Sequence, residues 1–313
     1  LELGADVYGY ALPPEREEDN FVVCKLGTLF HHNDGDVRDL KALIQLFDKI
    51  QPDIAFHLAA QPLVLESYKN PQETFSTNVM GTVNFFEVVR FNPSVKVAIN
   101  VTSDKCYQNN ELIRGYCEND PIGGKDPYSA SKGASEIITS SYIKSFFSGN
   151  DTANVASVRA GNVIGAGDWA KHRIVPDYFR ARKTNAQLVI RNPNATRPWQ
   201  HVLEPLSGYM HLASELYNMG KTFQGGWNFG PLDEMNRTVA ELIEKLGKLD
   251  NNTNIVYNNT EDNLEANLLK LDISKAVGQL NWMPDLDFKE TVKYTLEGYL
   301  SDLEGNSAIE NRR

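Results

Sequence analysis

The chain has 313 residues, 41% of them hydrophobic, and a formal net charge of −10 at pH 7. This length suits one large or two moderate domains, and the negative charge argues against nucleic acid or an anionic membrane as partner. Three cysteines without metal-ligand spacing and six scattered histidines favour a reducing compartment and no metal site. Because the sequence has no run of 18 apolar residues and no secretory signal at its start, we expect a cytoplasmic protein.

Short apolar runs alternate with helical patterns through the first half of the chain, which is typical of crossover units in a parallel sheet. The pattern predicts an α/β fold with a doubly wound, Rossmann-like parallel sheet, whose ligands gather at the carboxyl ends of the strands. The expected elements are a strand at 5–10, a helix at 37–50 opened by Asp36, a strand at 53–59, a helix at 71–91, a strand at 95–102, a helix at 128–147 and a strand at 154–159.

After Gly161 the pattern loosens into segments rich in Gly, Pro and Arg, and such irregular segments are usually binding loops. We expect residues 1–160 to form a cofactor-binding domain and residues 161–313 mainly a smaller α/β substrate-binding domain. Helices are expected near 238–249 and 288–303. The segment at about 200–230 is expected to return to the first domain.

Tyr128 and Lys132 lie four residues apart at the start of an apolar-patterned segment, so they share one face of a helix. A free phenol titrates near pH 10, and it needs a nearby cation to act as a base near neutrality. The pair therefore indicates hydride chemistry, with Lys132 lowering the pKa of Tyr128. Since 13 tyrosines give about one such spacing by chance, Tyr217 and Lys221 form a second pair, which we interpret as a solvated helix end.

The surroundings of Tyr128 distinguish it from the second pair. Asp126 and Pro127 break the chain immediately before it, and small residues follow on the helix surface, which a flat cofactor could approach. Three predicted strands end in polar or small residues, and their loops can meet over one site. These strand ends are Ala59-Ala60-Gln61, Thr102-Ser103-Asp104 and Arg159-Ala160-Gly161-Asn162.

The motifs resemble the extended short-chain dehydrogenase/reductase (NAD-dependent epimerase/dehydratase) family, and within it the CDP-glucose 4,6-dehydratase group. The resemblance runs from Gly9 to Trp282. It is carried by HLAAQPLV at 57–64, STNVMGT at 76–82, TSDKCY at 102–107, DPYSASKG at 126–133, VRAGNVIGAGDWA at 158–170 and RPWQHVLEPLSGY at 197–209.

The resemblance implies a bound NAD that is reduced and reoxidised within one turnover. Tyr128 would take the proton of the sugar 4-hydroxyl while the C4 hydride passes to NAD, and Lys132 would lower the tyrosine pKa and hold the nicotinamide ribose. Loss of water across C5 and C6 and return of the hydride to C6 would then convert CDP-glucose into CDP-4-keto-6-deoxyglucose. The resemblance also implies a homo-oligomer, a homodimer in the relatives, and a role in deoxysugar synthesis for a surface polysaccharide such as lipopolysaccharide O-antigen.

The tetrad before Tyr128 would carry the dehydration. Asp104 matches the family's general acid, and burial would favour the protonated form that this task needs; the alternative is an ordinary turn residue at a strand end. Lys105 stands where the dTDP-glucose dehydratases carry a glutamate base, and either proton transfer or electrostatic positioning remains open for it. Ser103 would bind the sugar 4-oxygen, or else act as a capping hydroxyl.

Binding contacts are carried over from the same motifs. The expected cofactor contacts, for which helix capping and close packing are the alternatives, are Asp36, Val37, Ala59, Ala60, Gln61 and Thr102, besides Tyr128 and Lys132. Asn78, inside a helical pattern, favours a local structural role. Guanidinium groups suit phosphate oxygens and an indole suits a flat ring, so the expected nucleotide-sugar contacts are Asn162, Asp168, Trp169, Arg191, Arg197 and His201, with Trp199, Arg159 and Arg173 also available.

The resemblance departs from the family at its start. The family begins with a strand and a Gly-x-x-Gly-x-x-Gly turn that binds the NAD pyrophosphate, and this sequence starts after that point, so we expect either about thirty further residues or weak cofactor binding. Two alternatives therefore stay open. One is an NAD-dependent nucleotide-sugar epimerase or reductase, which should lack the Asp104–Lys105 pair, and the other is a non-catalytic binding protein.

Overall fold

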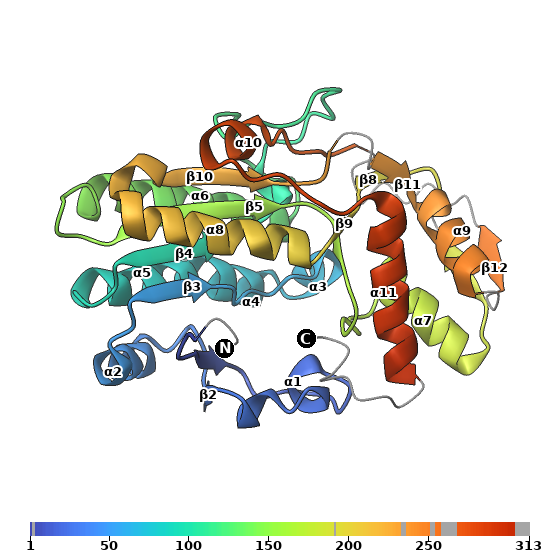
Figure 1. Cartoon of the computed structure of the whole chain (residues 1–313), viewed down its shortest axis with the longest axis horizontal. Helices are drawn as coiled ribbons and strands as arrows, with labels where there is room; N and C mark the ends of the chain where they lie inside the picture. Colours follow the sequence, from blue (N-terminus) through green and yellow to red (C-terminus); the bar gives the residue numbers. More distant parts are fainter. Residues whose placement is uncertain (2–3, 191, 233–235, 251–253, 258–267, 304–313) are drawn as a thin grey trace.

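The computed structural model describes residues 1, 4–190, 192–232, 236–250, 254–257 and 268–303. A four-stranded parallel sheet with the order β10-β5-β4-β3 occupies its centre (Figure 1). The strands are β3 (Ile54–His57), β4 (Val97–Val101), β5 (Asn154–Ala160) and β10 (Gly225–Phe229). This confirms the α/β class with a parallel, Rossmann-like sheet.

The two faces of this sheet are covered by different helices, and the side chains of β4 alternate between them. Val97 and Ile99 pack with α8 (Leu203–Met219) and α10 (Ser274–Leu280). Ala98 packs with α5 (Gly81–Phe91) and α6 (Pro127–Phe146). Figure 1 shows these two helices on the face of the sheet opposite α8. Burial on both faces explains why β4 is a continuous apolar run rather than an alternating one.

The chain before β3 forms a separate parallel sheet of β1 (Tyr8–Ala11) and β2 (His31–Asp34). Between them lie α1 (Asn20–Val23) and the 3-10 turn η1 (Leu26–Thr28). The expected start of the next helix at Asp36 is wrong. α2 runs over Leu40–Ile50 with Asp39 as its N-cap, because the Asp36 carboxylate instead pairs with Arg38.

The single helix expected at 71–91 is divided by a π-helical turn. After α3 (Val64–Lys69), the chain forms α4 (Pro71–Phe75), the π turn η2 (Ser76–Met80) and then α5. A π turn inserts one residue into the helical ladder and often marks a functional position. Here it carries the buried side chain of Asn78.

A second group of elements has its own apolar core, built around Trp169, Phe179, Trp199, Leu242 and Tyr299. Both helices expected in this half are present, as α9 (Val239–Asp250) and α11 (Phe288–Leu303). The other elements of this group are β6 (Val163–Ile164), α7 (Ile174–Thr184), β7 (Leu188–Ile190), β8 (Thr196–Pro198), β9 (Gln200–His201), β11 (Asn236–Thr238) and β12 (Ile255–Tyr257). The short turn η4 (Gly220–Phe223) follows α8 and packs with the core of the central sheet.

The expected division into two domains stays a prediction, and the strand pairing is as follows. β10 and α8, from the segment at about 200–230, belong to the central sheet and its cover. β8 pairs with β11, β7 with β12 and β6 with β9. Among the described residues, no helix is both long and apolar enough to cross a membrane.

Candidate active site

Parallel pairing brings three strand ends to one edge of the sheet. His57 of β3 lies opposite Asn100 of β4, and Val101 lies opposite Val158 of β5. The loops that follow these strands therefore start side by side. At Gly161, after β5, a Cβ atom would lie 3.3 Å from Asp104 Oδ2 and 3.2 Å from Pro198 Cγ. The lack of a side chain there lets β8 approach the residues that follow β4.

The residues after β4 form a compact turn, the 103–106 turn, whose 3-10 helix η3 spans Asp104–Cys106. Ser103 caps it: its hydroxyl donates to Asp104 Oδ1 at 2.9 Å and accepts from the Lys105 amide at 3.3 Å. The Lys105 ammonium lies 3.6 Å from the same carboxylate oxygen. Asp104 is only 1% exposed, and its Oδ2 has no hydrogen-bond partner among the described residues. Such a buried oxygen is costly unless a hydrogen-bond donor, from water or from a ligand, binds it.

Tyr128 faces this turn from the first turn of α6. The helix begins there because Asp126 caps the Ser129 amide at 3.0 Å and Pro127 occupies the first helical position. On balance the pKa of Tyr128 is raised, because burial, the largest cause, outweighs the charge of Lys105 and a hydrogen bond with Ser103, which lower it. The phenol therefore lies beside Ser103, as the resemblance implies, and close to Lys105.

Lys132 lies one helical turn further along α6, and its ammonium donates to the Val101 carbonyl at 3.2 Å. Burial lowers the pKa of Lys132 to about 8, and the charge of Glu136 opposes that shift. The sequence assigned the tuning of Tyr128 to Lys132. In the structure, the cation that lowers the tyrosine pKa most is Lys105, because the Lys132 side chain is directed to the end of β4.

The loop after β3 is fixed to α6 through Asn78. The Asn78 side chain accepts from the Gln61 amide at 2.8 Å, donates to the Gln61 carbonyl at 3.1 Å and donates to Ser131 Oγ at 2.8 Å. Ala59 and Ala60 are partly exposed at the end of the sheet. Asn78 therefore has the structural role that its helical context favoured, and it positions an expected cofactor loop.

Three other expected cofactor contacts already have partners inside the protein. The Thr102 hydroxyl donates to Glu136 and to the Val158 carbonyl. The Asp36 carboxylate lies 2.5 Å from the Arg38 guanidinium, and the Val37 carbonyl accepts from Asn84 at 2.9 Å. The expected cofactor roles of these three residues stay predictions.

On the substrate side, Arg197 lies on β8, largely buried, and donates to the Thr196 carbonyl at 3.0 Å. The Asn162 carbonyl accepts from the Gln200 amide at 3.2 Å, which joins the loop after β5 to β9. His201 is buried, and burial lowers its pKa, so its imidazole is neutral near neutral pH. Arg191 lies outside the described residues.

Two expectations for ligand binding are corrected by burial. Trp169 and Trp199 are core side chains, and Trp169 contacts Tyr299 edge to face at 5.1 Å, so its ring packs inside the protein rather than against a nucleobase. Arg159 is not available to a phosphate, because it is 4% exposed and forms an ion pair with Glu136 at 2.6 Å.

Arg173 is the arginine whose positive charge lowers the pKa of Tyr128. Its guanidinium pairs with Asp168 at 2.7 Å. The sequence placed Arg173 only among several arginines of the irregular segment. Its proximity to α6 depends on how the loop before α7 folds back, and no local pattern encodes that contact.

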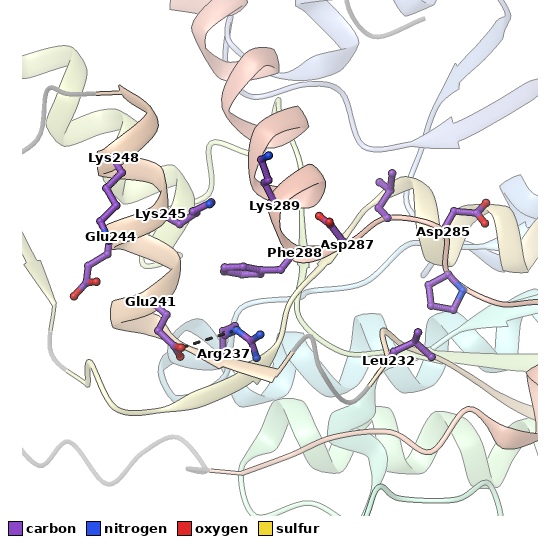
Figure 2. Close-up of a pocket in the computed structure, with 12 residues that line it drawn as sticks. Leu232, Arg237, Glu241, Glu244, Lys245, Lys248, Asp285, Asp287, Phe288 and Lys289 are labelled. Carbon is purple, nitrogen blue, oxygen red and sulfur yellow. Dashed lines mark ion pairs between the residues drawn. The ribbon is translucent and has the colours of Figure 1, made fainter.

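A pocket of about 580 Å³ lies elsewhere, between α9, β11 and the start of α11 (Figure 2). Its lining includes four cationic and four acidic side chains, so it offers little net attraction for an anionic nucleotide. Figure 2 shows Phe288 and the Arg237–Glu241 pair, whose atoms are 3.9 Å apart. Since the expected proton-transfer groups lie at the strand ends, we place the chemistry there.

Comparison with known proteins identifies the family of the chain. Residues 19–295 match the sequence profile of a family described as GDP-mannose 4,6-dehydratase. The chain is 45% identical to CDP-glucose 4,6-dehydratase of Salmonella typhimurium, over 98% of this chain and 87% of that protein. It is 24% identical to dTDP-glucose 4,6-dehydratase of Haemophilus influenzae, over 85% of this chain and 81% of that protein.

Among solved structures, UDP-glucose 4-epimerase from Stenotrophomonas maltophila superimposes with a TM-score of 0.84 at 17% identity. The match covers 97% of this chain and 93% of that one. At this identity the likeness concerns the fold alone. The profile and the 45% identical relative together establish that the chain belongs to the GDP-mannose 4,6-dehydratase family.

Proposed function

We propose that the protein is an NAD-dependent hydro-lyase that converts CDP-glucose into CDP-4-keto-6-deoxyglucose. The relative that is 45% identical carries the name CDP-glucose 4,6-dehydratase. One observation carries the proposal: the Asp104 carboxylate, with one oxygen buried and unpartnered, lies in the same turn as the Lys105 ammonium and beside Tyr128. Water loss needs an acid and a base in addition to the tyrosine, whereas epimerisation through C4 oxidation needs neither.

The residues at the strand ends fit the nicotinamide half of NAD. Small side chains at Ala59 and Ala60 leave room for a flat ring, and Asn78 holds their loop. The Lys132 ammonium, on the same helix face as Tyr128, would hold the nicotinamide ribose. When bound, NAD would supply the reversible acceptor for the sugar hydride.

The protein's own groups would then move the protons. Tyr128 takes the proton of the sugar 4-hydroxyl as C4 is oxidised, and Ser103, which bonds both the tyrosine and the Asp104 carboxyl, holds the 4-oxygen. The resulting ketone acidifies the C5 proton, which a base removes, and Lys105, in its neutral amine form, is the neighbouring candidate for it. Asp104 gives its proton to the departing 6-hydroxyl, which leaves as water. With NAD bound, the hydride would return to C6 while the protonated base gives its proton back to C5, so no reductant is consumed. The proton taken up by Tyr128 balances the one that Asp104 has lost.

Arg197, Asn162 and His201 would contact the nucleotide sugar, because β8 and β9 lie against the loop after β5. Arg173 lies close enough to influence Tyr128, and we add it as a ligand for the diphosphate or the sugar. Asp168 would then act through Arg173, which it orients. We also propose that two copies of the chain form a homodimer.

The test is incubation of the NAD-supplemented protein with CDP-, dTDP-, UDP- and GDP-glucose, followed by mass spectrometry. We expect the mass of one water to be lost from CDP-glucose at the highest rate, and Tyr128→Phe to form no product. Conversion of a substrate to an isomer of unchanged mass would instead establish the epimerase alternative. Absence of turnover with all four sugars, under conditions in which the chain binds NAD, would reject the proposal.

A further inference from the structure

A buried ion pair bonds the two residues that flank the 103–106 turn in the sequence, Thr102 and Tyr107. Glu136 and Arg159 meet at 2.6 Å with side chains 4% and 5% exposed. Glu136 lies on α6, one turn beyond Lys132 and two beyond Tyr128, so the three side chains share a helix face. Burying two charges is costly unless their remaining polar atoms are bonded. Here each of these atoms except Arg159 Nε forms a hydrogen bond within the described residues.

The carboxylate of Glu136 binds the chain that enters the turn. It accepts hydrogen bonds from the Thr102 hydroxyl on one oxygen and from Ser157 Oγ, at 2.7 Å, on the other. Thr102 immediately precedes Ser103. The preceding carbonyl, that of Val101, accepts from Lys132. The entrance to the turn is therefore attached to α6 at two consecutive residues.

The guanidinium of Arg159 binds the chain that leaves the turn. It donates to the Tyr107 hydroxyl at 2.6 Å and to the Glu118 carbonyl at 3.2 Å. Tyr107 immediately follows η3, and its hydroxyl donates in turn to Asn228 Oδ1 on β10 at 2.7 Å. One ion pair thus joins both ends of a turn that carries Ser103, Asp104 and Lys105.

We propose that the Glu136–Arg159 pair is a positioning clamp that holds the 103–106 turn in register with Tyr128 and Lys132. The inference rests on the proposed function for its kinetic meaning. The clamp sets where the Asp104 acid and the Lys105 ammonium stand relative to the sugar, while it touches neither sugar nor cofactor. Its loss affects the water-loss step, which depends on the turn, more than ligand binding.

The sharpest test removes a single hydroxyl. Tyr107→Phe deletes the bond from Arg159 together with the bond to Asn228, and keeps the ring. Tyr116→Phe is the matched control, because Tyr116 is an equally buried tyrosine stacked on Tyr107 at 5.2 Å. Its hydroxyl bonds Asn109 and the Asn110 amide instead of the ion pair. We expect Tyr107→Phe to lower kcat about 10-fold with little change in KM and with accumulation of NADH during turnover. Tyr116→Phe should match the wild type.

A second pair of variants separates positioning from stability. Glu136→Gln leaves Arg159 buried without its counter-charge and should lower the melting temperature as well as kcat. Adding Arg159→Met removes the stranded charge, so the melting temperature should recover while kcat stays low. Recovery of kcat together with the melting temperature would show that the pair only stabilises the fold, and it would overturn the clamp.

Hydrogen exchange gives a readout that does not need turnover. In the clamp account, amides of residues 102–107 exchange faster in Tyr107→Phe than in the wild type, and Tyr116→Phe leaves them unchanged. If the wild type is inactive, the proposed function is rejected, and the hydrogen-exchange comparison alone tests whether the clamp exists. An active wild type with unchanged kcat in Tyr107→Phe would reject the clamp and leave the proposed function intact. Equal exchange in all three proteins would also reject the clamp.

Discussion

The Lys132 ammonium donates a hydrogen bond to the main-chain carbonyl of Val101 at 3.2 Å. This bond joins the helix that carries Tyr128 to the end of the strand that leads into Ser103 and Asp104. It fixes the distance between a phenol and an acid that come from different elements. The same bond directs the Lys132 ammonium to the end of β4. Among the cations, Lys105 has the largest effect on the pKa of Tyr128.

The pKa of Lys132, about 8, predicts how activity changes with pH. Burial lowers it, the charges of Glu136 and Cys106 raise it, and His57 faces it as a neutral ring whose pKa falls to about 3. Because the ammonium is lost as pH rises through about 8, we expect kcat/KM to decline above that pH. A pH–rate profile that stays flat to about pH 10, where a free lysine titrates, would contradict this.

The same shift has a consequence for folding. In the unfolded chain Lys132 keeps its proton up to about pH 10.4, so between about pH 8 and 10 the unfolded state binds more protons than the folded state. The free energy of unfolding therefore rises with pH in this window because of Lys132. Denaturant titrations across it should show this rise in the wild type and a smaller one in Lys132→Met. Equal slopes would mean that Lys132 is not the buried titrating group.

Tyr128→Phe should lower turnover by about 10²–10⁴-fold, because it removes the group that accepts the 4-hydroxyl proton and little volume. Calorimetry should find CDP-glucose binding largely unchanged. Unchanged turnover would remove Tyr128 from the proton-transfer path. A matching loss of binding would mean that the hydroxyl supports the pocket instead of the chemistry.

Asp104→Asn should separate the two halves of the reaction. The amide keeps the shape of the carboxyl and cannot give a proton to the departing 6-hydroxyl, so C4 oxidation should proceed and NADH should accumulate. Its absorbance during a single turnover reports this directly. Full dehydration by Asp104→Asn would eliminate the general-acid assignment.

Asn78→Ala should weaken NAD binding, because it frees the loop at Ala59–Gln61 from α6. The loss of three hydrogen bonds should also lower the free energy of unfolding by about 1–3 kcal/mol. Asn154→Ala is the control, since it deletes a partly buried amide bonded to the Leu216 carbonyl at 2.9 Å, at the opposite end of the sheet. Equal NAD affinity in the two variants would show that Asn78 supports only the fold.

The sequence predicts the parts of this protein that depend on local pattern. The apolar runs of β4 and β5 mark buried parallel strands, and the Asp126-Pro127 break marks the start of α6, so Tyr128 and the 103–106 turn are found without coordinates. The family resemblance then supplies the reaction. The oligomeric state, the cytoplasmic location and the two-domain division stay predictions.

What the sequence could not supply is the pairing of distant groups. Arg159 looks like a free phosphate ligand until Glu136, 23 residues away, is seen beside it. Trp169 looks like a stacking platform, although Tyr299 covers it from the far end of the chain. Sequence alone places the N-cap of α2 three residues too early, because Asp36 and Asp39 are both good capping residues, and only the Asp36–Arg38 contact selects Asp39.

The central claim is that one site removes a hydride from C4 of the sugar and returns it to C6 of the same molecule. The most direct measurement is turnover of CDP-glucose deuterated at C4, with NMR of the product. We predict that deuterium appears in the C6 methyl group and does not exchange with added unlabelled NADH. Deuterium that stays at C4, or that is lost to the solvent or to the NADH pool, would contradict the account.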